Sequence, residues 1–290
     1  MLGIDAGASH TRIRLEDRPG AAVVERAGAG LNGDDVTPEI LDQDLRALLD
    51  GCPRPGVVVA GVAGHAGVRT AVGAWLEHWS GARVTTVPDY VLALRSFAPP
   101  VGIVVSAGTG SVVVSHDHAG RVVKTGGLGY RLGDEGSAFR LGQALVARYL
   151  EGVPEATRLG GAIEHALGAA RADVVRTVHE SRQPAAVLGR VAPVLTTAAD
   201  AGDEWAQNLV AREMAPLAEL TARHVERFRG PSATDAITIG LAGGVWRSVS
   251  ARDAFGAAVA ALLDSVRLVP ADHPPVVGAL RLAWLAGNVT

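Results

Sequence analysis

The chain has 290 residues, enough for one large domain or two moderate ones, and either arrangement can bury a core. Its 27 Lys and Arg residues nearly balance 30 Asp and Glu residues, and the basic residues are dispersed along the sequence. This balance argues against nucleic acid or an anionic membrane surface as the main partner.

The cysteine count and the hydropathy pattern exclude further classes of protein. Cys52 is the single cysteine, which excludes an intrachain disulfide framework and a cysteine-rich metal site. No apolar run is long enough to span a membrane, and the opening M-L-G-I-D indicates a strand rather than a signal peptide. We therefore expect a cytoplasmic protein.

The first hundred residues predict a mixed α/β region that ends at Pro99-Pro100. Alternating and β-branched runs indicate strands at residues 2–6, 11–16, 21–27, 57–62 and 83–87. Helical periodicity and capping residues indicate helices at residues 37–50, 68–79 and 88–97.

After this boundary the same order of elements begins again. Strands are expected at residues 101–106, 111–115, 121–125, 236–241 and 266–269, and helices at residues 245–263 and 275–286. Residues 138–230 have an almost entirely helical pattern, which predicts an inserted helical subdomain. The repeat predicts an N-terminal lobe over residues 1–100, joined by a last helix at about 275–290, and a C-terminal lobe over residues 101–274.

Two glycine turns in the second half of the chain suggest the chemistry. An apolar strand pattern runs into S-A-G-T-G-S at residues 106–111, where glycines let backbone N–H groups converge on an anion. This turn joins two antiparallel strands, unlike a Rossmann or Walker loop. The acidic turn G-D-E-G-S at residues 133–137 precedes a helix and suits hydroxyl groups. A turn for phosphate followed by a turn for hydroxyls suggests a kinase.

Four motifs in order carry a resemblance to a known family. They are I-D-A-G-A-S at 4–9, S-A-G-T-G-S at 106–111, G-G-L-G at 126–129 with G-D-E-G-S at 133–137, and L-A-G-G-V-W at 241–246. The chain resembles the sugar-kinase/actin/Hsp70 superfamily, and within it the N-acetylglucosamine kinase and BadF/BadG-type ATPase family. The resemblance implies an actin-like ATPase fold, with two ribonuclease H-like α/β lobes around an ATP/sugar cleft and a helical insertion in the second lobe.

The resemblance also assigns roles to residues of this sequence. Asp89 would be the catalytic base that takes the proton from a sugar hydroxyl during phosphoryl transfer. Asp5 would be the metal-site residue, contacting Mg²⁺ on the ATP phosphates through water. ATP would be held by Asp5, Gly7, Ala8, Ser9, His10, Thr11, Gly108, Thr109, Gly110, Gly189, Gly243 and Gly244. The sugar would be held by Asn32, Asp89, Ser111, Gly127, Leu128, Gly129 and Asp134.

Each polar residue in these sets also has a plainer structural explanation. Asp89 is an acid at a helix N-terminus, where the helix dipole favours it. Asp5 and Asp134 can cap a turn or a helix, and Asn32 beside a glycine is a common turn former. The first turn has Ala8 where the family commonly has glycine, and Val112 and Leu128 replace an asparagine and an aromatic residue that the family uses near the sugar.

The expected function is therefore an ATP-dependent hexosamine kinase that uses Mg²⁺ and phosphorylates N-acetylglucosamine at the 6-hydroxyl. The family also implies a homodimer. Glucosamine, a muramic sugar or another amino sugar stays open as the substrate. Two alternatives of another class are an ATPase activator of radical dehydratases, which needs two cysteines per subunit for a shared cluster, and a non-catalytic sugar sensor.

One further motif predicts a different enzyme class. Residues 28–33 read G-A-G-L-N-G, a literal G-x-G-x-x-G that follows a strand and precedes a helix. That strand is the third of a meander rather than the first of a β-α-β unit, and Asp34-Asp35 would repel a pyrophosphate. A dinucleotide oxidoreductase is therefore disfavoured.

Overall fold

The computed structural model describes residues 1–7, 9–31, 37–117, 119–229 and 236–287. The chain divides into two compact units, each described here by itself. Unit 1 comprises Met1–Pro100 and Ala271–Thr290, and unit 2 comprises Val101–Pro270. Within the described ranges, none of the helices combines the length and apolar character needed to cross a bilayer.

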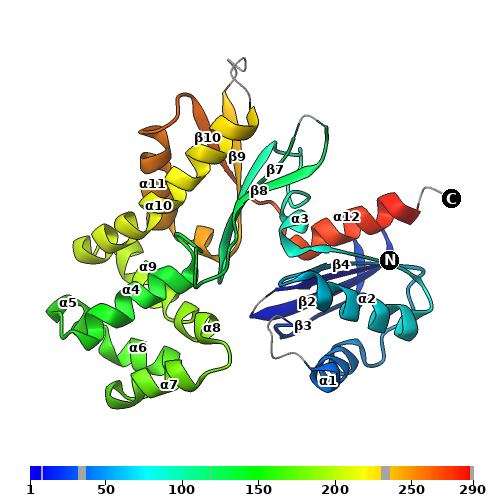
Figure 1. Cartoon of the computed structure of the whole chain (residues 1–290), viewed down its shortest axis with the longest axis horizontal. Helices are drawn as coiled ribbons and strands as arrows, with labels where there is room; N and C mark the ends of the chain where they lie inside the picture. The colour runs from blue at the N-terminus through cyan, green and yellow to red at the C-terminus, as the bar shows by residue number, and fades with distance from the viewer. Residues whose placement is uncertain (8, 32–36, 118, 230–235, 288–290) are drawn as a thin grey trace. The chain divides into compact units, whose positions relative to one another are not determined.

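Unit 1 is a five-stranded mixed sheet with helices on both faces (Figure 1). The strand order is β3-β2-β1-β4-β5; β1 pairs in parallel with β4, and β4 with β5, whereas β2 is antiparallel to both of its neighbours. The strands are β1 (Leu2–Ala6), β2 (His10–Arg18), β3 (Ala21–Ala29), β4 (Val57–Val62) and β5 (Arg83–Pro88). The helices are α1 (Pro38–Leu49), α2 (Ala66–Ser80), α3 (Asp89–Ala93) and α12 (Pro275–Gly287).

The alternation of β1 explains how its two faces are used. Leu2, Ile4 and Ala6 enter a core with residues of α1 and α2. Gly3 and Asp5 point to the opposite face, because successive side chains of a strand alternate. On that face β4 packs against α3 and α12, and Figure 1 shows α2 and α12 on opposite sides of the strands of unit 1.

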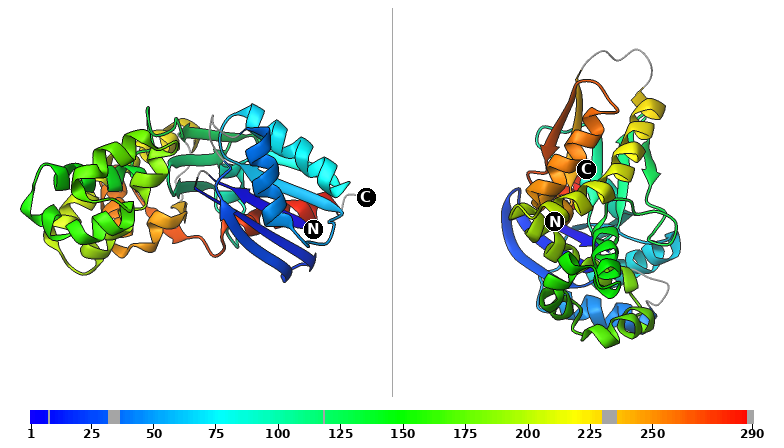
Figure 2. Two further views of the ribbon diagram at one scale, coloured as in Figure 1. Left: turned by 90° about the horizontal axis from the view of Figure 1, so that it is seen from below. Right: turned by 90° about the vertical axis from the view of Figure 1, so that its left-hand side faces the viewer.

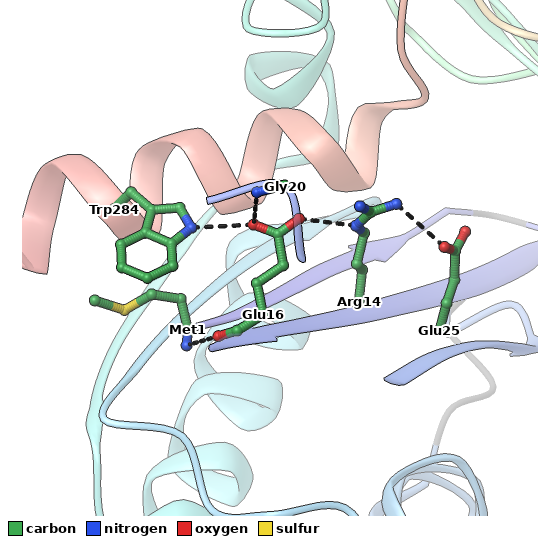
Figure 3. A network of polar contacts seen from close by, with 6 residues as sticks. All are labelled: Met1, Arg14, Glu16, Gly20, Glu25 and Trp284. Carbon is green, nitrogen blue, oxygen red and sulfur yellow. Dashed lines mark hydrogen bonds and ion pairs between the residues drawn. The ribbon is translucent and has the colours of Figure 1, made fainter. Parts of the chain in front are cut away.

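The C-terminal helix α12 is fixed to the sheet by a buried carboxylate (Figure 3). The Glu16 side chain accepts hydrogen bonds from Arg14 Nε at 3.0 Å, from the Gly20 amide at 3.1 Å and from Trp284 Nε1 at 3.1 Å. The Glu16 carbonyl also accepts a bond of 2.7 Å from the Met1 amine. These partners satisfy a carboxylate that would otherwise be costly to bury, and they tie the last helix to β2.

Unit 2 repeats the plan of unit 1. Its strand order is β10-β9-β6-β7-β8, with β6–β7–β8 antiparallel and β6, β9 and β10 parallel. The strands are β6 (Ile103–Ala107), β7 (Ser111–His116), β8 (Val122–Gly126), β9 (Ile237–Ala242) and β10 (Val266–Pro270). Two mixed α/β sheets in repeated order confirm the fold class predicted from the sequence.

The segment between β8 and β9 is helical, as predicted. It contains α4 (Ala138–Leu150), α5 (Pro154–Arg158), α6 (Gly160–Leu167), η1 (Arg171–Asp173), α7 (Val174–Glu180), α8 (Pro184–Gly189), α9 (Ala192–Asp200) and α10 (Glu204–Arg229). Figure 2 shows these helices, mostly green, packed on one another. The 3-10 turn η2 (Gly244–Arg247) and α11 (Val249–Ala260) then follow β9.

Two predicted helices are shorter than expected. The helix predicted at residues 88–97 ends at Ala93, after which the Arg95 and Ser96 amides donate to the carbonyls of Leu92 and Ala93, three residues back. The carbonyls of Arg95 and Phe97 accept hydrogen bonds from the Arg281 guanidinium of α12. The helix predicted at residues 245–263 is divided by Ser248, whose hydroxyl caps α11 by accepting from the Ala251 amide at 3.1 Å.

Replacing Gly142 with alanine should destabilise unit 2. A Cβ at Gly142 of α4 would collide with the backbone carbonyl of Leu188 in α8, and backbone cannot yield cheaply. We expect a loss of about 1–3 kcal/mol in the free energy of unfolding, measured by urea denaturation. Gly161→Ala is the matched control in α6, because a Cβ there meets nothing within 4 Å, and it should be neutral or slightly stabilising. Equal stability of the two variants would contradict this packing.

Buried His224 should make the stability of the protein depend on pH. Its side chain, 0% exposed, bonds Thr125 Oγ1 at 2.8 Å and Ser115 Oγ at 2.9 Å, joining α10 to β7 and β8. Burial, with the nearby Arg227 charge, lowers the pKa of His224 to about 4. Below about pH 6.5 the imidazole of His224 takes up a proton in the unfolded chain but not in the folded chain. The free energy of unfolding therefore decreases as the pH is lowered from about 6.5 to about 4.

From pH 7.5 to pH 5 this histidine should cost about 2 kcal/mol of unfolding free energy. Burial of Asp5 raises its pKa to about 7 and acts in the opposite direction, so the informative quantity is the difference between wild type and His224→Gln. Urea unfolding at the two pH values measures it, with exposed His179→Gln as the control. A pH dependence that is the same in all three proteins would contradict the role of His224.

Candidate functional site

In unit 1, the predicted catalytic and metal-site acids lie at one edge of the sheet. Asp5 of β1 is in register with Gly61 of β4, and Gly61 with Val87 of β5. Asp89 follows two residues later as the first residue of α3. Since the carboxyl ends of parallel strands meet at the same sheet edge, the topology brings Asp5 and Asp89 together.

Close helix packing positions Asp89. A Cβ at Gly61 would overlap the Leu92 side chain and lie 3.2 Å from Asp89 Cα, so the glycine lets α3 rest directly on β4. On the other side of α3, Gly278 of α12 approaches the carbonyl of Leu92. Gly3 of β1 meets α12 in the same manner, at the carbonyl of Val276. Asp89 is therefore carried on a helix wedged between the sheet and α12.

The electrostatics of this edge show that the two acids interact. Burial, followed by the negative charge of Asp89, raises the pKa of Asp5 to about 7, and the Arg12 charge opposes this shift. One carboxylate oxygen of Asp89 accepts a hydrogen bond of 2.9 Å from the Tyr90 amide. Neighbouring carboxylates are the oxygen donors that Mg²⁺ prefers, so the residues present fit the metal that the sequence predicted beside ATP.

Sequence reasoning missed Arg12. It is the register partner of Asp5 across the β1–β2 pair, so both side chains lie on the same face of the sheet. Arg12 is exposed and its charge acts on Asp5. The alternation of β2 could have revealed it, because Ile13 and Leu15 fix the core face and leave Arg12 and Arg14 on the other.

The β1–β2 turn carries the remaining predicted phosphate residues of unit 1. The Gly7 amide donates to the His10 carbonyl at 3.0 Å and closes the turn, which includes Ser9. Ala8 lies outside the described residues. Thr11 pairs with Ala6, so its side chain lies on the core face, where it is 1% exposed and its hydroxyl has no hydrogen-bond partner among the residues that the structure describes. The structure thus does not bring the Thr11 hydroxyl to the face of Asp5.

In unit 2, the predicted phosphate turn is the corner between β6 and β7. The Gly108 amide donates to the Gly110 carbonyl at 2.9 Å. The first amides of α4 are bound to the same corner: Ala138 N donates to Gly108 O at 2.8 Å, and Phe139 N donates to Thr109 O at 3.2 Å. The corner is thereby held at the beginning of a helix, where the dipole favours an anion.

The acidic turn folds back onto this corner. Asp134, at φ 63°, accepts a bond of 3.2 Å from the Ser111 amide, and a Cβ at Gly110 would lie 2.8 Å from its carboxylate. The Ser111 hydroxyl donates to the Glu135 carbonyl at 2.6 Å. Burial raises the pKa of Asp134, partly offset by the bond from Ser111. The predicted phosphate turn and the predicted hydroxyl-binding acid are therefore in direct contact.

The predicted sugar turn lies beside the same corner. Gly126, Gly127 and Gly129 all have left-handed backbone angles, with φ of 74°, 62° and 78°. A Cβ at Gly127 would lie 3.0 Å from the Val112 side chain, next to Ser111. Leu128 is 62% exposed, so its side chain points away from the core.

The last predicted ATP residues also gather at this corner. Gly243, at φ 111°, packs against the backbone of Ala107, and Gly244 begins η2. Gly189 ends α8, in the middle of the helical insertion. A Cβ at Gly189 would nevertheless lie 3.8 Å from Thr109.

Three further sequence predictions concern Asn32, the single cysteine and possible metal ligands. Asn32 lies outside the described residues. Cys52 is a free, half-buried thiol packed against the core of unit 1. Among the His, Cys, Asp and Glu side chains that the structure describes, no group of three or more could hold a metal ion.

Comparison with known proteins identifies the family. The model of the BadF/BadG/BcrA/BcrD ATPase family matches residues 2–283. The chain belongs to that family. A curated relative, the N-acetylmuramic acid/N-acetylglucosamine kinase of Clostridium acetobutylicum, is 27% identical over 156 residues, which cover 49% of this chain and 50% of the relative. The chain thus aligns with about half the length of that relative.

Solved structures share the fold of this chain. A candidate N-acetylglucosamine kinase from Chromobacterium violaceum is 25% identical, with a TM-score of 0.72 and coverage of 97% of this chain and 98% of that one. A second candidate N-acetylglucosamine kinase, from Porphyromonas gingivalis, has a TM-score of 0.77 at 18% identity, covering 100% and 99% of the two chains. A glucokinase of the ROK family from Streptomyces griseus has a TM-score of 0.65 at 16% identity, covering 98% and 99%. The predicted family and the actin-like sugar-kinase fold are confirmed.

Proposed function

We propose that this ATPase-family protein is an ATP-dependent kinase that phosphorylates the 6-hydroxyl of N-acetylglucosamine or a closely related N-acetylated amino sugar. The observation that carries the proposal is the contact between Asp134 and the Gly110-Ser111 corner. A phosphate-binding corner beside a hydroxyl-binding carboxylate suits a reaction that joins the two groups. The N-acetylglucosamine kinases among the similar proteins support the substrate class.

In this proposal the phosphates of ATP bind at two backbone turns. In the corner at residues 108–110 the Gly108 amide closes the turn, and the phosphates would approach the backbone that follows it. The β1–β2 turn, with His10 and Arg12, would offer donors and a positive charge. Asp5 would hold Mg²⁺ through water, and the ion, when bound, would neutralise charge on the transferred phosphoryl group. Gly189, Gly243 and Gly244 would bound the nucleotide on the remaining sides of the corner.

Asp89 would act on the sugar. A carboxylate accepts the proton of the 6-hydroxyl as that oxygen attacks the terminal phosphorus, so positive charge does not build up on the attacking oxygen. The position of Asp89 at the start of α3, wedged between β4 and α12, fixes its backbone and limits the entropy that orientation would cost.

The sugar would be oriented by unit 2. Ser111 and Asp134 would bind hydroxyl groups, and the backbone of Gly127, Leu128 and Gly129 would complete the contacts from unit 2. Asn32 belongs to unit 1 and keeps the sugar-binding role that the family resemblance assigns to it. Val112 and Leu128 give this side an apolar wall, which suits the methyl of an N-acetyl group better than a charged amine. N-acetylglucosamine is therefore favoured over glucosamine.

An ADP-release assay with a panel of sugars tests the proposal. The panel contains N-acetylglucosamine, N-acetylmuramic acid, glucosamine and glucose, with ATP and Mg²⁺, and mass spectrometry locates the phosphate on the product. We expect turnover with N-acetylated amino sugars and product phosphorylated at the 6-position. ATP hydrolysis unaffected by every sugar would overturn the kinase proposal. The family resemblance also leads us to propose a homodimer, which light scattering of the purified protein measures.

A further inference from the structure

A pocket of about 390 Å³ lies in unit 1 between the end of β3 and α1, within the size range of small-molecule sites. The backbone of residues 27–29 lines it, together with the apolar side chains of Leu31 and Leu48. Strand and helix come close here, because a Cβ at Gly28 would lie only 3.3 Å from the Leu48 side chain. The pocket thus uses the G-A-G-L stretch at 28–31, which has no role in the proposed phosphoryl transfer.

The Thr11 hydroxyl is the buried polar group of this pocket. Thr11 of β2 is in register with Gly28 of β3, and its side chain lines the pocket on the sheet face that α1 covers. It is 1% exposed, and its hydroxyl bonds none of the residues that the structure describes. Because buried hydroxyls are normally hydrogen-bonded, this one is available to a ligand.

A carboxylate and a guanidinium also line the pocket. Asp44 lies one helical turn before Leu48 on α1, is half-buried, and forms no hydrogen bond or ion pair within the described part of the chain. Arg26 shares the sheet face of Gly28 and donates from Nη1 to the carbonyls of Leu48 at 3.2 Å and Asp50 at 2.6 Å. These bonds hold the guanidinium beside the pocket and leave its Nε and Nη2 donors for another acceptor.

We propose that this pocket binds a free α-amino acid with a short hydroxylated side chain. The ammonium would bind Asp44 and the carboxylate would bind Arg26, both through charge-assisted hydrogen bonds. The side-chain hydroxyl would bond Thr11, and the alkyl part would contact Leu31 and Leu48. A zwitterion matches a site with one charge of each sign, whereas a singly charged ligand leaves one of the two protein charges without a partner. The inference does not depend on the proposed function.

Calorimetric titration of amino acids into the purified protein tests the site. L-threonine and L-serine are the probes, and we expect saturable binding with a Kd of about 1 mM or lower. L-valine has the shape of L-threonine without the hydroxyl and should bind about tenfold or more weakly. Ethanolamine lacks the carboxylate of L-serine, and L-lactate lacks an ammonium. Each should bind about tenfold or more weakly than L-serine.

Two variants test the contacts to the protein. Asp44→Asn should weaken L-threonine binding about tenfold or more. Its control is Asp17→Asn, which removes an exposed carboxylate at the far end of β2 and should change nothing. Thr11→Val keeps the shape of the side chain and should reduce the preference for L-threonine over L-valine about tenfold. Its Tm should equal or exceed that of the wild type, because the buried hydroxyl that it removes has no partner.

Three results would overturn the inference. The first is a lack of saturation by both L-threonine and L-serine up to about 10 mM. The second is binding of ethanolamine or L-lactate as tight as that of L-serine. The third is an equal effect of Asp44→Asn and Asp17→Asn, with thermal unfolding verifying that both variants are folded. The kinase proposal is tested by ADP release without any amino acid, so either proposal can fail while the other stands.

Discussion

Replacing Asp89 with asparagine should lower kcat by about 10²- to 10⁴-fold, the usual scale for loss of a general base. Asparagine keeps the shape of the side chain and an oxygen that can accept the Tyr90 amide, so the start of α3 is preserved. What it removes is the ability to take the proton from the sugar hydroxyl. The affinity for ATP should change little, because the proposed phosphate contacts come from other residues. Stopped-time assays with saturating sugar and ATP, and calorimetric titration of ATP, measure the two quantities.

Asp272→Asn is the matched control for this experiment. Asp272 is an exposed acid of unit 1 that accepts from the Ala98 amide at 3.0 Å, so its replacement removes the same charge away from the sheet edge. Its kcat should equal that of the wild type. Near-normal turnover in Asp89→Asn would leave Asp89 only the role of stabilising the start of α3.

The sequence was sufficient to predict the fold because local and global signals agree. Buried strands such as β4 are continuous apolar runs, and β1 alternates between Ile4 and Asp5. Repetition of the same element order in both halves then left few possible topologies. The lengths of α3 and α11 were less predictable, because the backbone after α3 changes to bonds three residues back and a single hydroxyl starts α11.

The sequence predicted the parts of the candidate site that are formed by glycine-rich turns. It was less informative about which side of the sheet a strand residue lies on. Glycine-rich segments identified the corner at Gly108 and the turn at Gly127 without any tertiary information. The register of β2 against β1 puts Thr11 and Arg12 on opposite faces of the sheet. A motif that treats the whole turn as one phosphate-binding unit does not contain this information. The position of Gly189 beside Thr109 depends on how α8 packs within the insertion, and nothing local in the sequence specifies that contact.

The bond between Asp134 and Ser111 likewise joins residues far apart in the sequence, and it changes how Asp134 should be tested. This carboxylate supports the corner and, in our proposal, also binds the sugar. Alanine would remove both functions and would place a residue with no local hydrogen bond at φ 63°, which costs about 1–2 kcal/mol. Asparagine tolerates this conformation and can still accept the Ser111 amide, so it removes only the charge.

We therefore expect Asp134→Asn to raise the sugar KM about tenfold or more, since charge-assisted hydrogen bonds contribute about 1.5–3 kcal/mol, with little change in Tm or in ATP binding. Asp134→Ala should weaken sugar binding at least as much and should also lower Tm. Asp117→Asn, in the β7–β8 connection, is the control for loss of a carboxylate of unit 2 away from the corner, and it should leave the sugar KM unchanged. A normal sugar KM in Asp134→Asn, with a defect confined to the alanine variant, would show that Asp134 only supports the corner and that other groups bind the sugar hydroxyls.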